Sequence, residues 1–197
     1  MLRRAVFFDR DGTLCENNDP VVDPRRLRLL PRAAEAVRRL NRGGWQVVVV
    51  TEQPGVAFGE FDEDVLAEIH EQMRLLLLED GARLDGIYHC PHHPEARLQR
   101  YRHRCACRKP GVALFERARD EMGIDLDASF LFSDNVRVLQ AAATCGIRPV
   151  LVRTGGGRDD EERLTQLGPG TVPVVDAIDD AVGLALRQPL VTGATVS

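Results

Sequence analysis

Apolar positions in this chain fall into two patterns: short uninterrupted runs, and longer stretches with the spacing of one helical face. The runs have the length and composition of strands buried on both faces of a parallel sheet. They lie at Ala5–Phe8, 46–51, 86–89, 129–132, 149–152 and 172–175. The helical stretches lie at 33–41, 62–80, 112–122, 136–145 and 178–187, and the first four are followed by a glycine, as a C-cap. This alternation predicts an α/β fold in which helices cover both faces of one parallel sheet.

Composition narrows the class of protein. The chain has 197 residues, 44% of them hydrophobic, which suits one sizeable core, so we expect a single domain over 1–187 and a frayed tail over 188–197. A formal net charge of -4 argues against nucleic acid as a partner, because such binding relies on a basic face. No stretch reaches the ~20 apolar residues of a membrane helix. We therefore expect a soluble, cytoplasmic monomer without a membrane partner.

Two carboxylates follow the first expected strand directly. Asp9 and Asp11 flank one arginine and precede Gly12 and Thr13. Open α/β sheets bind ligands at the carboxyl ends of their strands, which is where both carboxylates are expected. An Asx turn would explain one aspartate but explains two beside a glycine poorly. The pattern D-x-D-G-T resembles the signature of the haloacid dehalogenase superfamily, in which the first aspartate mostly serves as a phosphoryl-accepting nucleophile.

Three more polar residues interrupt the apolar pattern, two at later strand ends and one, Lys109, ahead of an expected helix. Thr51, Lys109 and Asp134 complete, in order and in type, the four motifs of that superfamily. Asp9 would accept the phosphoryl group, and Asp11 would protonate the leaving oxygen and later activate water. Thr51 and Lys109 would hold phosphoryl oxygens. The Asp9 and Asp134 carboxylates with the Asp11 carbonyl would form a Mg²⁺ site, which offsets the repulsion between a carboxylate and a phosphate dianion.

A second cluster has the spacing of a structural zinc site. Cys90 and His92 form C-x-H, twelve residues intervene, and Cys105 and Cys107 form C-x-C. Three thiolates and one imidazole make a complete tetrahedral Zn²⁺ set with no open position. His93 is the alternative imidazole. In a chain that looks cytosolic, paired cysteines favour a metal over disulfides, although reduced, metal-free thiols are a competing interpretation. The expected zinc loop spans 90–107.

The zinc loop narrows the resemblance. Segments 9–13, 85–94, 105–110 and 153–155 resemble the D,D-heptose 1,7-bisphosphate phosphatases, and the resemblance runs from about residue 5 to 180. It implies a three-layer α/β/α Rossmann-like sheet, a capless haloacid dehalogenase-type core, Mg²⁺ and Zn²⁺, and hydrolysis of the 7-phosphate of a phosphorylated sugar. The related histidinol-phosphate phosphatases share these motifs and are the nearest competitor. A phosphotransferase is a third candidate, and a weakly active or non-catalytic binder of phosphorylated metabolites is a fourth.

The resemblance also implies which residues contact the substrate. Arg108, beside the zinc loop, would recognise its distal part, because a guanidinium suits a second phosphate. The segment carrying Asn17, Asn18 and Asp19 lies where the family contacts substrate. A set of further expected contacts lies next to the motif residues. These are Glu52, Gln53 and Asn135.

Several motif positions depart from the family pattern. Glu52 stands where the family usually has Asn, Pro54 where it has Ser, Asn135 where the closest members have Lys, and Val138 where it has a second acid. One hypothesis is that Glu52 replaces the missing acid through a water-mediated metal contact. A second is a shift toward a monophosphate or a cationic substrate, because the pocket becomes more negative. A third is weakened catalysis.

Overall fold

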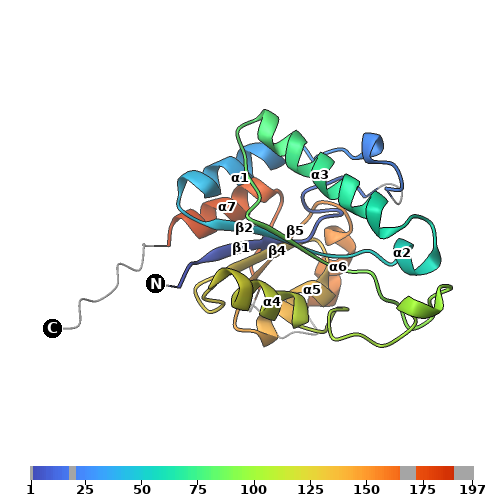
Figure 1. The fold of residues 1–197 in the computed structure, drawn as a ribbon. Coiled ribbons are helices and arrows are strands. Elements are labelled where there is room, and N and C mark those ends of the chain that lie inside the picture. The colour runs from blue at the N-terminus through green and yellow to red at the C-terminus, as the bar shows by residue number, and fades with distance from the viewer. Residues whose placement is uncertain (1, 18–20, 165–171, 189–197) are drawn as a thin grey trace.

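Six parallel strands form the centre of the molecule. The structure, a computed structural model, describes residues 2–17, 21–164 and 172–188 (Figure 1). Its strands are β1 (Ala5–Phe8), β2 (Gln46–Glu52), β3 (Gly86–Cys90), β4 (Phe130–Ser133), β5 (Arg148–Val152) and β6 (Val174–Val175). They lie in the order β3-β2-β1-β4-β5-β6, and every neighbouring pair is parallel. The order reverses direction at β1, so a crevice is expected at the carboxyl ends of β1, β2 and β4.

Helices cover both faces of this sheet. They are α1 (Ala33–Arg42), α2 (Gly55–Phe58), α3 (Glu63–Glu79), α4 (Ala113–Met122), α5 (Val136–Thr144), α6 (Gly157–Arg163) and α7 (Ile178–Leu186), with 3-10 turns at Pro24–Arg26 and Gln99–Tyr101. Helices α1, α3 and α7 pack on one face, and α4 and α5 on the other (Figure 1). The predicted three-layer α/β/α fold is therefore confirmed. None of the helices in the described ranges is long and apolar enough to cross a membrane.

The central strand β1 is buried on both sides, as its uninterrupted apolar run predicts. Val6 and Phe8 pack with α1, α3 and α7, and Ala5 and Phe7 pack with α4 and α5. Phe8 meets Phe132 of β4 edge to face, with ring centroids 5.3 Å apart. Burying a side chain of this size stabilises the fold by roughly 1.5–3 kcal/mol. The residues that follow β1 and β4 therefore start from well-packed strand ends.

The predicted elements differ from the observed ones mainly at their ends. Each predicted strand and helix is present within two residues of its expected bounds. Two short helices, α2 and α6, were not predicted, because four and seven residues are too few to show an apolar period. Of the expected tail, residues 189–197 lie outside the described ranges.

Candidate active site

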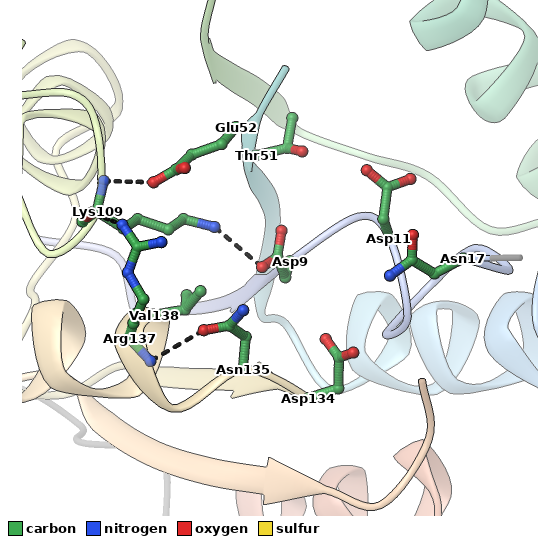
Figure 2. A pocket seen from close by; sticks show the side chains of 10 residues that line it. All are labelled: Asp9, Asp11, Asn17, Thr51, Glu52, Lys109, Asp134, Asn135, Arg137 and Val138. Atoms are coloured by element: carbon green, nitrogen blue, oxygen red, sulfur yellow. Dashed lines mark hydrogen bonds and ion pairs between the residues drawn. The ribbon is translucent and has the colours of Figure 1, made fainter. Parts of the chain in front are cut away.

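Asp9, the first residue after β1, is paired with a buried lysine. Lys109 Nζ donates to Asp9 Oδ2 at 3.0 Å and to the Val50 carbonyl oxygen at 3.3 Å. Both side chains are largely buried, with 13% of Asp9 and 5% of Lys109 exposed. Burial raises the pKa of Asp9, and the Lys109 ammonium works against that rise. The result is a poorly solvated carboxylate at the floor of a pocket of about 230 Å³ (Figure 2).

Asp134, the first residue after β4, lies at the other side of that floor. Its Oδ1 accepts from the Thr13 hydroxyl at 3.1 Å, and its Oδ2 accepts from the Gly156 N–H at 2.9 Å. Burial, followed by the charge of Asp9, raises the pKa of Asp134 to about 6. Gly12 makes this approach possible, because a Cβ there would lie 2.1 Å from Asp134 Oδ2.

The oxygen atoms around Asp9 and Asp134 fit a magnesium ion. The carboxylates of Asp9 and Asp134, whose negative charges repel each other, stand beside the turn that carries the Asp11 carbonyl. Hard oxygen ligands of this kind are those that Mg²⁺ takes in proteins. A divalent cation between the carboxylates would also relieve the repulsion from Asp9, which adds to burial in raising the pKa of Asp134.

Asp11 is held by a buried arginine. Arg10 is 2% exposed and donates from Nε to Asp11 Oδ1 at 2.8 Å and from Nη2 to Oδ2 at 2.9 Å. Gln53 Nε2 donates to Asp11 Oδ2 at 2.9 Å and to the Thr51 hydroxyl at 2.8 Å. Gln53, expected to contact substrate, thus links the two catalytic candidates Asp11 and Thr51. The fork of Arg10 fixes the plane and direction of the Asp11 carboxylate.

Glu52, the last residue of β2, contacts the segment that carries Lys109. Its Oε1 accepts from the Lys109 backbone N–H at 2.5 Å, and its Oε2 lies 3.0 Å from Arg108 Nη1. Figure 2 shows its carboxylate on the Lys109 side of the pocket, across from Asp134. This geometry favours a positioning role over the hypothesised water-mediated metal contact.

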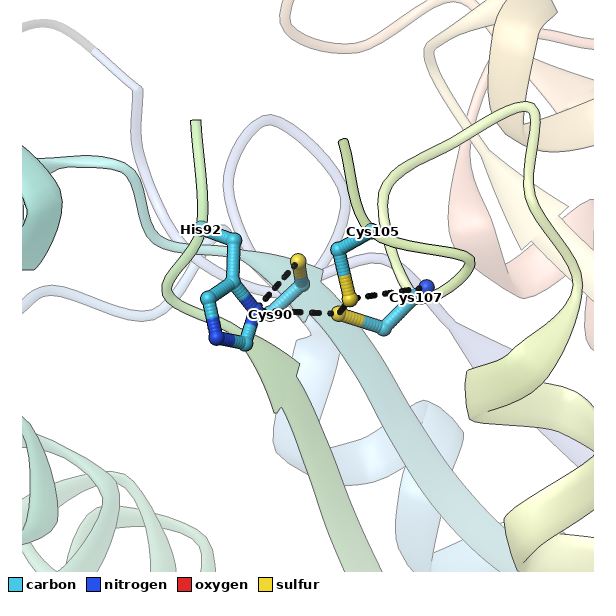
Figure 3. A group of neighbouring side chains, drawn as sticks. All are labelled: Cys90, His92, Cys105 and Cys107. Atoms are coloured by element: carbon cyan, nitrogen blue, oxygen red, sulfur yellow. Dashed lines mark hydrogen bonds between the residues drawn. The ribbon is translucent and has the colours of Figure 1, made fainter. Parts of the chain in front are cut away.

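The four predicted zinc ligands meet at one point. Their ligand atoms all lie within 4.8 Å of one another (Figure 3). His92 Nδ1 is 3.8 Å from Cys90 Sγ and 3.5 Å from Cys107 Sγ. A hydrogen bond from Cys107 is the main cause that lowers the pKa of the Cys90 thiol to about 6. Three sulfur atoms and one imidazole nitrogen at this spacing fit Zn²⁺. His93 lies outside the cluster, where its Nδ1 accepts from the Glu95 N–H at 3.1 Å.

Comparisons with known proteins agree with this geometry. A HAD-hydrolase-like family model matches residues 106–181. D-glycero-β-D-manno-heptose-1,7-bisphosphate 7-phosphatase from Photorhabdus laumondii is 41% identical over 152 residues, 77% of this chain and 81% of the relative. The enzyme of that name from Vibrio cholerae is 35% identical over 189 residues, 95% of this chain and 98% of the relative. The chain belongs to this phosphatase family.

A solved structure supports the same family. D,D-heptose 1,7-bisphosphate phosphatase from B. bronchiseptica, complexed with magnesium and phosphate, superposes with a TM-score of 0.81. It is 34% identical, and the match covers 94% of this chain and 99% of the other. As a member of the heptose bisphosphate phosphatase family, the chain is a phosphoric monoester hydrolase with a haloacid dehalogenase-like fold. The predicted family resemblance is confirmed.

In this family member, the cluster of Cys90, His92, Cys105 and Cys107 lies next to the segment that carries Lys109. The 90–107 loop packs on α2 and α3 through a small apolar cluster, and the Tyr101 hydroxyl donates to Glu63 at 2.7 Å. Between the last two ligands of the cluster, the Ala106 carbonyl accepts from the Ala113 N–H at 3.2 Å, at the start of α4. Lys109 lies in the short segment between Ala106 and Ala113, which this hydrogen bond closes. Fixing the loop therefore fixes the chain from which Lys109 reaches Asp9.

The structure gathers most of the residues expected from the sequence in one pocket. The lining residues are Asp9, Asp11, Asn17, Thr51, Glu52, Lys109, Asp134, Asn135, Arg137 and Val138. Arg108 lies beside this pocket, against Glu52. Asn18 and Asp19 lie outside the described residues.

Sequence reasoning missed two arginines of this site. Arg10 stands between the two motif aspartates, and its burial could not be read from a polar segment. Arg137 follows Asn135 by two residues, in the first turn of α5, and brings a cation into the pocket. Its place in the first turn of a helix that starts at a ligand-binding strand end was an available signal.

Proposed function

We propose that this protein is a Mg²⁺-dependent phosphatase that removes the 7-phosphate of D-glycero-D-manno-heptose 1,7-bisphosphate through a phospho-Asp9 intermediate. The observation that carries the proposal is the Asp9–Lys109 pair, with 3.0 Å between Oδ2 and Nζ, opposite Asp134 at the carboxyl end of the sheet. Membership of a family named for this reaction supports the substrate. A related structure complexed with magnesium and phosphate supports the metal.

The first step transfers the phosphoryl group to Asp9. A carboxylate oxygen of Asp9 attacks phosphorus, and the bond from phosphorus to the sugar oxygen breaks. Asp11 gives its proton to the departing sugar oxygen. The Lys109 ammonium and the Thr51 hydroxyl hold the phosphoryl oxygens as charge moves across them. Arg10 and Gln53 keep Asp11 aimed during this step, since together they contact both of its oxygens.

The second step returns Asp9 to its starting state. Asp11, now a carboxylate, takes a proton from a water molecule, and that water attacks the phosphorus of phospho-Asp9. Inorganic phosphate leaves, and the Asp9 carboxylate pairs with Lys109 again. Mg²⁺, held by the Asp9 and Asp134 carboxylates and the Asp11 carbonyl, would neutralise charge that otherwise repels the attacking carboxylate.

Zinc has a structural role in this proposal. Cys90, His92, Cys105 and Cys107 would fill all four positions of Zn²⁺, so none is left for substrate or water. The ion would hold the loop that leads into Arg108 and Lys109. Its loss would therefore weaken substrate binding before it changes the chemistry.

Phosphate release from a small substrate panel tests the proposal. The panel holds both anomers of heptose 1,7-bisphosphate, histidinol phosphate, fructose 1,6-bisphosphate and an aryl phosphate, each with Mg²⁺. We expect a kcat/KM of ~10⁴ M⁻¹s⁻¹ or more for one heptose anomer. A preference for histidinol phosphate would contradict the proposed substrate while keeping the mechanism. Transfer of the phosphoryl group to a second sugar, seen in the products, would contradict hydrolysis.

A further inference from the structure

The cations around the catalytic pocket have different partners. Lys109 and Arg137 line the pocket, and Arg108 stands beside it. The Lys109 ammonium is bound by Asp9 and by the Val50 carbonyl, so it serves the nucleophile and the group being transferred. A substrate with two anionic groups needs a further cation for the group that is not transferred.

Arg108 forms an ion pair with the Glu52 carboxylate. Its Nη1 lies 3.0 Å from Glu52 Oε2, and both side chains are mostly buried, with 19% of Arg108 and 16% of Glu52 exposed. Glu52 is itself fixed by the Lys109 N–H. An anion that approached Arg108 would meet the Glu52 carboxylate as well, and this neighbour opposes the attraction.

Arg137 has no such competitor. Within the described residues, no carboxylate lies within ion-pair distance of its guanidinium, which donates from Nη2 to the Lys109 carbonyl. The Asn135 side chain accepts from the Arg137 N–H at 2.9 Å and thereby fixes the backbone at the start of α5. Figure 2 shows Arg137 beside Lys109, on the wall that also carries Asn135. The remaining donors of this guanidinium are available to a ligand.

We infer that Arg137 is a specificity-determining residue that binds the substrate's second phosphate, the one that is not transferred. The inference rests on the proposed function and deepens it. A guanidinium presents two parallel N–H donors to a phosphate, and charge-assisted pairs of this kind are the stronger hydrogen bonds in proteins. The contact with the Lys109 carbonyl orients this fork at the edge of the pocket that holds the nucleophile.

The test compares one sugar with and without its second phosphate. Wild type, Arg137→Gln and Arg137→Lys are assayed on heptose 1,7-bisphosphate and on heptose 7-phosphate. We expect Arg137→Gln to lower the ratio of the two kcat/KM values by about 10-fold or more, through a higher KM for the bisphosphate. Arg137→Lys should keep part of the preference. If Arg137 only supported Lys109, both substrates would lose rate equally and the ratio would not move.

Two further variants make the result specific. Arg117→Gln removes an exposed arginine of α4 that pairs with Glu121 at 3.3 Å, and it should leave the ratio unchanged. The double variant Glu52→Gln, Arg108→Gln removes the competing ion pair and should lower the ratio less than Arg137→Gln does. The inference is overturned if Arg137→Gln keeps the wild-type ratio. A wild type that ignores the second phosphate would overturn both the inference and the proposed substrate, whereas a preference retained by Arg137→Gln would overturn the inference alone.

Discussion

The candidate catalytic pocket and the Cys/His cluster proposed to bind zinc are assembled in opposite ways. The pocket draws Asp9, Thr51, Lys109 and Asp134 from four separate parts of the chain, and the ion pair at its centre joins residues 100 positions apart. The Cys/His cluster takes all its ligands from the short segment 90–107, and their ligand atoms all lie within 4.8 Å of one another. The first depends on the sheet, whose parallel strands all end at one edge. The second depends on a loop that a metal can close.

This difference suggests that the pocket performs the chemistry and that the Cys/His cluster positions the chain beside it. The pocket keeps partly desolvated, mutually repelling carboxylates, whose pKa values are raised by burial. Carboxyl groups with pKa values shifted in this way are typical of residues that react or bind a metal. The cluster offers a complete set of four ligands and nothing further to a substrate. Damage to the pocket should therefore stop turnover and leave the fold, whereas damage to the cluster should loosen the fold and weaken binding.

The largest effect is expected from Asp9→Asn. It removes the nucleophile and keeps the size of the side chain, so kcat should fall by about 10⁴-fold or more. Zinc content and the melting temperature, measured by metal analysis and circular dichroism, should stay close to those of the wild type. Near-normal hydrolysis by this variant would refute the assignment of Asp9.

A smaller effect on rate, with a larger effect on stability, is expected from Cys105→Ser. The variant should lose its zinc, melt about 5–10 °C lower and show a KM roughly 10-fold higher, with kcat within about threefold. Cys145→Ser is the matched control, because Cys145 lies outside the cluster, at the end of α5. A Cys105→Ser protein that loses kcat at an unchanged KM would break the distinction between the two regions.

The smallest effect concerns acid stability beside the zinc loop. His70 of α3 is buried, its ring centroid is 5.5 Å from that of His89, and its Nε2 has no hydrogen-bond partner within the described residues. Burial is the first cause, ahead of the nearby Arg10, His89 and Arg74, that lowers the pKa of His70 to about 3. The unfolded chain takes up this proton near pH 6.5 while the folded chain does not, so stability falls as pH drops below 6.5.

Replacing His70 should remove this acid sensitivity. His70→Leu should lose less stability between pH 7 and pH 5 than the wild type does, by about 2 kcal/mol in urea unfolding. His70→Gln, which also cannot titrate, should show the same flatter dependence. Equal pH dependence in all three proteins would mean that His70 is not the group responsible.

Much of the fold and both clusters could be predicted because their signals are local. Uninterrupted apolar runs such as Ala5–Phe8 indicate buried strands. The C-x-H and C-x-C pairs have the spacing of metal ligands within one short loop. The C-x-H spacing favours His92 over His93, and the structure places His92 beside the three cysteines. The candidate catalytic residues were predicted from strand ends and motif order, and the structure brings them into one pocket.

The contacts of the altered positions could not be predicted, since they depend on register between distant segments. Glu52 meets the Lys109 N–H across 57 positions, and no pattern in either segment indicates that contact. Arg137 enters the pocket because α5 starts directly after β4 and its first turn faces the pocket. The pocket is consequently less negative than a count of the substituted motif residues suggests.

Trapping the phosphoryl group on Asp9 tests the central claim most directly. The Asp11→Asn variant is mixed with Mg²⁺ and 4-nitrophenyl phosphate. The 4-nitrophenolate of this substrate leaves without help from an acid, whereas the variant lacks the base that activates water for the second step. We expect a burst of one nitrophenolate per active site, and, after acid quenching, borohydride reduction and peptide mass spectrometry, homoserine at position 9. Asp9→Asn should give neither signal. A burst without modification of residue 9, or modification of another residue, would contradict the account.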